Sequence, residues 1–429
     1  MWENAIARGT GEGKEQMENS VQKVVIVGAG HAGGTLAALL RQYKFEGDVT
    51  LIGDEGHPPY QRPPLSKAWL TGAVEQKDLL LKPASYYADH KIALHTDDPV
   101  TAVNLGERIV RTTSGKCFAY DALVFATGAR ARTTDVLNCS IDGILTLRDI
   151  QDASALRARA QCARNVVIVG GGYIGLEAAA SISKMGVSVT LVERSARLLN
   201  RVASTAIADA LLKRHESAGV RFLFDTTVVS VETHASRVER ATLENGEQLD
   251  CDLLLVGMGI VPNDDLARAA GIACDRGILV NPESVSSDPH VFGIGDVAMH
   301  CASRFGIRRR VESISNAVDQ AKQVAAQIVR RAVPRLDVPW FWSDQYDLKI
   351  QMAGLTADGS TALARAASDG DGITVLHLDD DRLVGVETIN RPRDFMVART
   401  AISRGQQLNL DIAREVDAPL SAALLQPQS

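Results

Sequence analysis

A strand, a glycine-rich turn and a helix follow one another twice in this chain, and no other feature constrains the fold as strongly. The copies begin at residues 24–33 (VVIVGAGHAG) and 166–175 (VVIVGGGYIG). Glycines in such a turn let a pyrophosphate approach the backbone amides at the positive end of the helix. The turns lie 170 − 28 = 142 residues apart, too far for one Rossmann domain. The sequence therefore predicts two dinucleotide sites, with glycines Gly28, Gly30 and Gly33 in one and Gly170, Gly172 and Gly175 in the other.

Each copy continues into a second strand that ends in an acidic residue. DVTLIGDE supplies Asp54 to the first copy, and VSVTLVERS supplies Glu193 to the second. A carboxylate here accepts a hydrogen bond from a ribose hydroxyl, so the full pattern indicates dinucleotide binding more strongly than the glycines alone. Because Glu193 would repel a ribose phosphate, we expect NADH at the second site. Arg194 and Arg197 keep NADPH open, since an arginine could turn toward a phosphate.

Length and composition exclude several classes of protein. The 429 residues predict two or three domains. A formal net charge of −6 argues against a nucleic-acid scaffold, and no apolar run approaches the ~18 residues that span a bilayer. Residues 1–20 lack the apolar core of a secretion signal, so we expect a flexible tail and a cytoplasmic protein. The six cysteines are widely spaced, which is typical of reduced thiols and predicts no metal site.

Two later segments are informative only in combination with the glycine turns. One strand runs into ATG at 126–128, and another runs into GD at 295–296. Alone, each also fits an ordinary strand-to-turn junction. Together with the two turns they resemble the two-dinucleotide-binding-domain flavoproteins, which have the glutathione-reductase-like fold. The resemblance covers residues 21 to about 420 and implies FAD at the first turn and NADH at the second.

The cysteines separate the branches of that family. Between Val24 and Lys116 the sequence has no cysteine, and RPPLSK occupies 62–67. Disulfide reductases of this fold keep a cysteine pair soon after the first turn, and peroxide-reducing relatives keep one cysteine there. Together with GGGYIGLE, ATGAR, GIGDVA and FWSDQYD, the RPPLSK motif resembles the NADH–ferredoxin reductases of oxygenase systems, of the putidaredoxin reductase and biphenyl dioxygenase reductase types.

Glu177 lies in the second helix, at a position where small apolar side chains would pack on a sheet. A buried carboxylate without a partner is strongly unfavourable. Lys67 is the counter-ion that we expect, since two prolines stiffen its approach and the resemblance implies that it lies beside the reactive nitrogen of the flavin. We predict an ion pair across two domains, in which Lys67 stabilises negative charge on the reduced flavin and Glu177 fixes Lys67. Two separately solvated charges are the alternative.

The resemblance also implies contacts to FAD, residue by residue. Besides Lys67 and the glycines of the first turn, these residues are Ala32, Asp54, Val100, Ala126, Thr127, Gly128, Arg148, Asp296 and Ile314. Val100 also fits an ordinary strand residue, and Arg148 a solvated arginine. Trp342, near Trp340, would line the electron exit or pack in a core. His31 departs from the family pattern and would either titrate near the pyrophosphate or point to solvent.

The order of these motifs predicts an α/β fold with two Rossmann-like dinucleotide-binding domains and a small α+β C-terminal domain. The predicted boundaries are 21–134 and 267–334 for the FAD domain, 135–266 for the inserted NADH domain and 335–429 for the C-terminal domain. In the last domain, TVLHLDDDRLVGVETIN predicts two strands around an acidic turn, and RDFMVARTAISRG predicts a helix.

We therefore expect an FAD-dependent NADH:ferredoxin reductase. Its acceptor would be a 2Fe–2S ferredoxin that supplies a cytochrome-type monooxygenase or a Rieske dioxygenase. A basic run that includes Arg304, Arg308, Arg309 and Arg310 would steer an acidic ferredoxin, or is only a solvated face. A rubredoxin or nitrite reductase-type NADH reductase remains the alternative. An apoptosis-inducing-factor-like signalling protein that binds DNA is disfavoured by the net charge.

Overall fold

The computed structural model describes residues 21–301, 308–356, 359, 361–366 and 372–425. The predicted tail and Arg304 lie outside these ranges. Contacts divide the chain into two compact units. The first unit holds the described parts of Met1–Arg62, Glu75–Arg130 and Ile260–Asp337. The second holds Pro63–Val74, Ala131–Gly259 and the described part of Val338–Ser429.

The segment Pro63–Val74, which carries Lys67, groups with the second unit and not with the rest of the predicted FAD domain. The physical reason is Leu70, whose fully buried side chain belongs to the same hydrophobic core as Leu176 and Ile182. The three-domain division predicted from the sequence stays a proposal.

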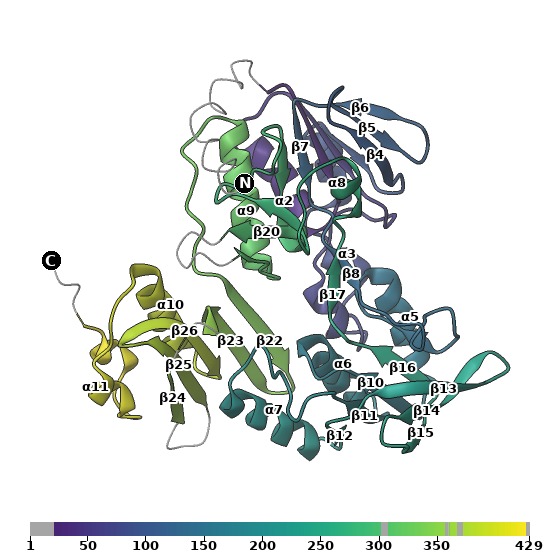
Figure 1. Cartoon of the computed structure of the whole chain (residues 1–429), viewed down its shortest axis with the longest axis vertical. Coiled ribbons are helices and arrows are strands. Elements are labelled where there is room, and N and C mark those ends of the chain that lie inside the picture. The colour runs from purple at the N-terminus through teal and green to yellow at the C-terminus, as the bar shows by residue number, and fades with distance from the viewer. Residues whose placement is uncertain (1–20, 302–307, 357–358, 360, 367–371, 426–429) are drawn as a thin grey trace. The chain divides into compact units, whose positions relative to one another are not determined.

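A five-stranded parallel sheet forms the centre of the first unit. Its strands, in spatial order, are β19 (Val291–Gly293), β7 (Ala122–Phe125), β1 (Lys23–Val27), β2 (Asp48–Ile52) and β3 (Ile92–His95). The layers on its two faces are helices α2 (His31–Gln42) and α9 (Ile314–Ile328), and an antiparallel meander of β4 (Val100–Asn104), β5 (Ile109–Thr112) and β6 (Cys117–Ala119). Because side chains alternate along a strand, Val24 and Ile26 pack with the helices, whereas Val25 and Val27 pack with the meander. Figure 1 shows α2 and α9 side by side.

The second unit repeats this layering. Its parallel sheet has the order β12 (Arg221–Leu223), β11 (Ser188–Val192), β10 (Asn165–Val169), β16 (Leu253–Val256) and β9 (Ile144–Leu145). Its helices are α5 (Ile150–Ala160), α6 (Tyr173–Lys184) and α7 (Thr205–Ser217), and its meander is β13 (Val228–His234), β14 (Arg237–Leu243) and β15 (Gln248–Asp250). Val166 and Ile168 pack with the helices, and Val167 and Val169 with the meander. Burial on both faces explains the continuous apolar strands of the two sequence copies.

An antiparallel sheet follows in the second unit. Its order is β22 (Trp340–Gln345), β23 (Leu348–Gly354), β26 (Arg382–Ile389), β25 (Ile373–Asp379) and β24 (Thr361–Ala366), and α10 (Pro392–Arg404) and α11 (Leu410–Arg414) follow it. The two predicted strands and the predicted helix are therefore present, and the predicted fold class is confirmed. Val386 packs with Phe395 of α10, whereas Ile350 and Val375 on the other face join the core of α6 and α7.

The remaining described elements are short. They are α3 (Gln76–Leu79), α4 (Ala84–Asp89), α8 (Asp265–Ala269), β8 (Ala129–Ala131), β17 (Ile260–Pro262), β18 (Ile278–Val280), β20 (Ala298–Cys301), β21 (Arg308–Arg309) and the 3-10 turns η1 (Pro63–Ser66), η2 (Gly295–Val297) and η4 (Leu420–Ala423). Within the described ranges, no helix combines the length and apolarity that crossing a membrane requires.

Candidate functional site

The three glycines of the first turn have different roles. A Cβ atom on Gly28 would lie 2.2 Å from the carbonyl oxygen of Ala126, and one on Gly33 would lie 2.0 Å from that of Gly28. Gly28 also has a φ of +111°, which side chains disfavour. At Gly30, by contrast, a Cβ atom would meet no described atom within 4 Å. The chain itself requires Gly28 and Gly33, whereas Gly30 leaves space for a ligand above the backbone.

The second turn has the same geometry. A Cβ atom on Gly170 would lie 2.4 Å from the carbonyl oxygen of Gly257, and one on Gly175 would lie 2.3 Å from that of Gly170. Space is open at Gly172, where no atom of the described chain lies within 4 Å of such a Cβ. Both turns therefore offer a cradle that any side chain at the middle glycine would fill.

Each middle glycine is also the N-cap of a helix. Gly30 precedes α2 and Gly172 precedes α6. Because glycine has no side chain, neither helix has its own capping oxygen, and the first-turn amides, such as that of Ala32, remain for a ligand. Open amides at the positive end of a helix suit a pyrophosphate. The residues of both turns therefore fit a dinucleotide, as predicted.

Glu193 directly follows β11 and is held by the turn itself. Its Oε2 accepts a hydrogen bond from the amide of Gly171 at 2.6 Å, and its Oε1 accepts one from the amide of Ser195 at 2.7 Å. Arg197, which could have turned toward a phosphate, donates to the carbonyls of residues 198, 200 and 203 at 3.1–3.2 Å. Arg194 is exposed. The Glu193 carboxylate is thus fixed at the end of β11, and the Arg197 guanidinium is held by carbonyl groups of the loop that follows.

Several predicted FAD residues lie together in the first unit. Ala126, Thr127 and Gly128 follow β7, and Ala126 contacts the turn at Gly28. The Thr127 hydroxyl donates to the carbonyl of Asn263 at 2.7 Å.

Asp296 lies next to Gly295, whose amide donates to Gln320 of α9 at 2.6 Å. A Cβ atom on Gly295 would lie 3.1 Å from the Cβ of Ala32. The GD segment therefore approaches the start of α2, where the pyrophosphate is expected.

Other predicted residues are more scattered. Asp54 is exposed two residues beyond β2, Val100 begins β4, and Ile314 is the first residue of α9. Arg148 and Trp342 belong to the second unit, so their approach to the flavin stays a prediction.

Trp342 packs in an aromatic cluster of the C-terminal sheet. Its ring centroid lies 5.4 Å from that of Trp340, which in turn lies 6.0 Å from that of Phe395. This contact supports the alternative in which Trp342 packs in a core.

His31 begins α2 beside the first cradle. Its Nδ1 is buried and has no hydrogen-bond partner among the described residues. Burial lowers the pKa of His31, and the charge of Asp296 partly offsets this effect. The side chain as a whole is only half-buried, so both roles of His31 stay predictions.

The predicted ion pair between Lys67 and Glu177 is confirmed. Glu177 is only 2% exposed, and its Oε2 lies 2.6 Å from the Lys67 Nζ. The same oxygen accepts from the Ser66 hydroxyl at 2.5 Å, and Oε1 accepts from the Ser343 hydroxyl at 2.5 Å. Both charges belong to the second unit, not to two different units as expected from the sequence. Three donors from η1, its C-terminal neighbour and β22 thus surround one buried carboxylate.

The sequence reasoning missed the two serines. Ser66 stands directly before Lys67 in RPPLSK, so its proximity could have been inferred from the lysine alone. Ser343 could have been found from the alternation along β22, where Ser343 and Gln345 are buried and Asp344 is exposed. Polar residues on the buried side of a strand indicate a buried polar partner.

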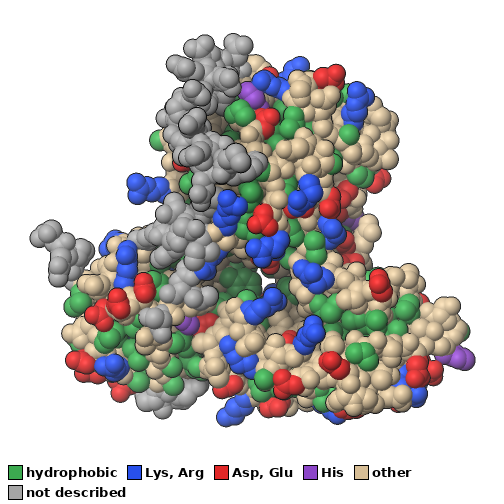
Figure 2. Space-filling model, in the orientation of Figure 1, with side chains coloured by type: hydrophobic (Ala, Val, Ile, Leu, Met, Phe, Trp, Pro, Cys, Tyr) green, Lys and Arg blue, Asp and Glu red, His purple; other side chains and the backbone are tan. Residues whose placement is uncertain are grey.

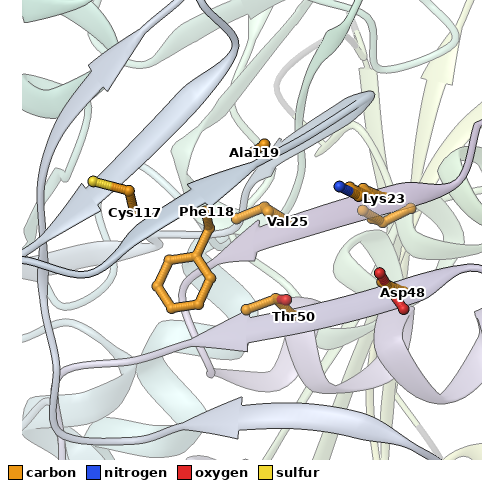
Figure 3. Close-up of a pocket in the computed structure, with 8 residues that line it drawn as sticks. Lys23, Val25, Asp48, Thr50, Cys117, Phe118 and Ala119 are labelled. Atoms are coloured by element: carbon orange, nitrogen blue, oxygen red, sulfur yellow. The ribbon is translucent and has the colours of Figure 1, made fainter.

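A separate cavity of about 200 Å³ in the first unit lies outside this site. Figure 3 shows Phe118 of β6 pointing over Val25 and Thr50, with Lys23 and Asp48 at one end. These residues line the beginnings of β1 and β2, whereas ligands of open α/β sheets bind at the carboxyl ends of strands. Within the described ranges, no three or more His, Cys, Asp or Glu side chains lie together in a way that could hold a metal ion.

Comparison with known proteins agrees with this geometry. A family model described as pyridine nucleotide-disulphide oxidoreductase matches residues 22–321, and one described as reductase C-terminal matches residues 340–424. A probable ferredoxin reductase of Castellaniella defragrans is 39% identical over 392 residues, which cover 91% of this chain and 96% of the relative. A rubredoxin–NAD(+) reductase of Ectopseudomonas oleovorans is 35% identical over 370 residues, which cover 86% of this chain and 96% of the relative.

A solved structure extends the similarity to the whole fold. The chain matches the covalent complex of putidaredoxin reductase with putidaredoxin at a TM-score of 0.91 and 34% identity, over 94% of this chain and 99% of that one. Two open glycine cradles, a buried lysine–glutamate pair and a C-terminal sheet thus occur in one chain that matches the family along most of its length. The chain belongs to the pyridine nucleotide-disulphide oxidoreductase family.

Proposed function

We propose that this chain is an FAD-dependent NADH:ferredoxin reductase. As a member of its family it is an oxidoreductase that uses FAD and NADH. When bound, FAD would take a hydride from NADH and return the electrons singly to a one-electron acceptor. The acceptor that we propose is a 2Fe–2S ferredoxin, which supplies a cytochrome-type monooxygenase or a Rieske dioxygenase.

The residues of the chain would bind, orient and stabilise. The amides at Gly30 and Ala32 would hold the FAD pyrophosphate, and those at Gly172 would hold that of NADH. Glu193 would accept from the NADH ribose, and Lys67 would lie beside the flavin and favour its negatively charged reduced state. Glu177 would touch no substrate and would fix the Lys67 ammonium. No nucleophile or general acid is needed in this scheme.

The lysine–glutamate pair is the observation that carries the proposal. The segment after the first turn has no cysteine before residue 117, so it cannot pass electrons through a thiol. In its place the chain positions a cation with a buried carboxylate at 2.6 Å. A fixed cation favours a reduced flavin without forming a bond to it, which suits transfer of single electrons to a protein acceptor.

An acceptor panel tests the proposal. Turnover with NADH is measured against a 2Fe–2S ferredoxin, a rubredoxin, glutathione disulfide and oxygen. We expect the highest kcat/KM with the ferredoxin. A higher value with rubredoxin would favour the alternative suggested by the similarity to a rubredoxin–NAD(+) reductase. Efficient reduction of glutathione disulfide would contradict the thiol-free route.

The docking surface that we propose lies at β21. Arg308 is exposed there, and Arg309 adjoins it. Arg310 is bound internally, because it forms an ion pair with Glu312 at 2.8 Å and donates to the carbonyl of Asp296 at 3.2 Å. We propose that the exposed Arg308, with Arg309 beside it, steers an acidic ferredoxin.

Ionic strength tests this assignment. Reduction of ferredoxin should weaken steeply with added salt, whereas reduction of ferricyanide should change little. The double variant Arg308→Ser/Arg309→Ser should remove most of the salt dependence. Equal salt sensitivity of the variant and the wild type would place the docking surface elsewhere.

A DNA-binding role receives no support from charge. Figure 2 shows Lys and Arg side chains interspersed with Asp and Glu side chains over the face in view.

We place the protein in the cytoplasm, because the five cysteines described as free thiols suit a reducing compartment.

A further inference from the structure

A line of buried hydrogen bonds leads from helix α7 to Glu177. Nε2 of His215 lies 2.8 Å from Oε1 of Gln345. The Gln345 amide nitrogen donates to the Ser343 hydroxyl at 3.0 Å, and that hydroxyl donates to Oε1 of Glu177 at 2.5 Å. His215 and Ser343 are 0% exposed, and Gln345 is 1% exposed. Water therefore cannot replace any of these partners without a structural change.

The chemistry of the groups gives this line one direction. An ionised carboxylate only accepts, so Ser343 must donate to Glu177 and can accept from the Gln345 amide nitrogen. That orientation leaves the Gln345 carbonyl facing His215, which must then carry its proton on Nε2. Nδ1 of His215 faces the Tyr346 hydroxyl at 3.5 Å, and Tyr346 lies 2.9 Å from the Ser183 hydroxyl. Each donor in the line therefore points toward Glu177.

A proton relay does not explain this line. The Gln345 amide would have to change to its imidic tautomer to pass a proton, whereas it orients its neighbours without any chemical change. The line instead ends on the oxygen of Glu177 that does not bind Lys67. Rotation of the carboxylate would break both contacts at once, so fixing Oε1 also fixes Oε2 and the lysine bound to it.

We propose that His215 is a positioning residue, which acts through Gln345 and Ser343 to hold the Glu177 carboxylate and thereby the Lys67 ammonium. This inference rests on the proposed function, in which Lys67 lies beside the flavin. The alternative role for His215 is packing alone, since its ring makes edge contacts with Phe222 at 5.9 Å and Tyr346 at 4.9 Å.

Two substitutions at position 215 separate these roles in the FAD-loaded protein. His215→Phe keeps a ring for the edge contacts and removes the N–H donor, whereas His215→Gln places an amide N–H near the position of Nε2. The rate of flavin reduction by NADH is measured by anaerobic stopped flow, and the flavin midpoint potential by chemical titration. His234→Phe, at an exposed position of β13, is the matched control.

His215→Phe should slow flavin reduction about fivefold, the effect of losing roughly one neutral hydrogen bond. The NADH concentration at half saturation should stay unchanged. The midpoint potential should become more negative by ~20 mV, which is that fivefold change at ~30 mV per factor of ten for two electrons. His215→Gln should restore both values, and His234→Phe should match the wild type.

Unchanged rate and potential in His215→Phe would overturn the proposal, even if the variant melted at a lower temperature. Equal impairment of both variants at position 215 would also overturn it and would leave packing as the role. The titrated potential does not depend on NADH. A wild type whose flavin NADH does not reduce would therefore contradict the proposed function, while the potentials still test the positioning role.

Discussion

Replacing Glu177 by Gln removes a buried negative charge from the second unit and keeps the shape of the side chain. The carboxylate accepts from three donors, the Lys67 ammonium and the Ser66 and Ser343 hydroxyls. A glutamine of the same shape can keep its oxygen toward Lys67 and Ser66. Its NH2 group then faces Ser343, which already accepts from Gln345. The Ser343 hydroxyl hydrogen loses its acceptor, and the lysine loses its counter-charge.

The size of the effect follows from these two losses. A hydrogen bond to a charged group contributes about 1.5–3 kcal/mol and a neutral one about 1 kcal/mol. Because the Lys67 side chain is 21% exposed, solvent screening places its loss at the lower end of that difference. The stranded Ser343 hydroxyl adds about 1 kcal/mol. We expect about 1.5 kcal/mol in all, which slows flavin reduction roughly tenfold if the loss falls on the transition state.

Anaerobic stopped flow with NADH measures this rate directly. The matched control is Glu232→Gln, which removes an exposed acid from its 3.1 Å pair with Arg240 and should leave the rate unchanged. Lys67→Met should slow the reaction at least as much as Glu177→Gln, and the double variant should be no slower than Lys67→Met. A wild-type rate in Glu177→Gln, or additive losses in the double variant, would refute the claim that the two residues act as a unit.

Three further predictions follow from the same geometry. Gly172→Ala should fold normally but weaken NADH binding at least tenfold in fluorescence titrations, because its methyl group would fill the cradle, whereas Gly170→Ala should fail to fold because of its 2.4 Å clash. Glu193→Ser should lower kcat/KM for NADH about tenfold and raise it for NADPH, and an unchanged ratio would contradict the ribose contact. Burial lowers the pKa of His215 to about 4 from the 6.5 of an exposed histidine, so the unfolded chain binds a proton that the folded chain excludes between these values. The stability that this group contributes is complete above about pH 6.5 and is lost toward pH 4. In calorimetry, His215→Gln should therefore flatten the fall in Tm over that interval. Part of the fall should persist in the variant, because burial also lowers the pKa of His300 to about 4.

The local chemistry of the sequence was sufficient to predict the glycine turns and the acidic strand ends, whereas the lysine–glutamate pair was predicted only with the help of the family resemblance. Gly28 and Gly170 meet carbonyl oxygens of residues far along the chain, Ala126 and Gly257, but the spacing of the glycines within each turn was enough to predict them. The grouping of Pro63–Val74 with the second unit could not be predicted in this way. It depends on the burial of Leu70 among side chains more than a hundred positions away, such as Leu176.

The hydrogen-bond partners of buried charges also could not be predicted from the spacing of residues in the sequence. Glu387 of β26 is 0% exposed, and its two carboxylate oxygens accept from the Ser204 amide at 3.0 and 3.1 Å, at the start of α7. His377 lies 3.1 Å from the same carboxylate. A carboxylate at a helix N-terminus is stabilised by the helix dipole as well as by the amide.

The C-terminal sheet therefore contacts α6 and α7 through two buried carboxylates, one on a helix and one on the sheet. It supplies Ser343 to Glu177 of α6, and it supplies Glu387 to the amide of Ser204 before α7. Each contact adds a partner from another element to a buried charge, so the helices and the sheet stabilise each other. The sheet that the sequence presents as a separate small domain is thus part of the structure that fixes Lys67, and damage to β22 should reach the flavin even where no residue of the sheet touches it.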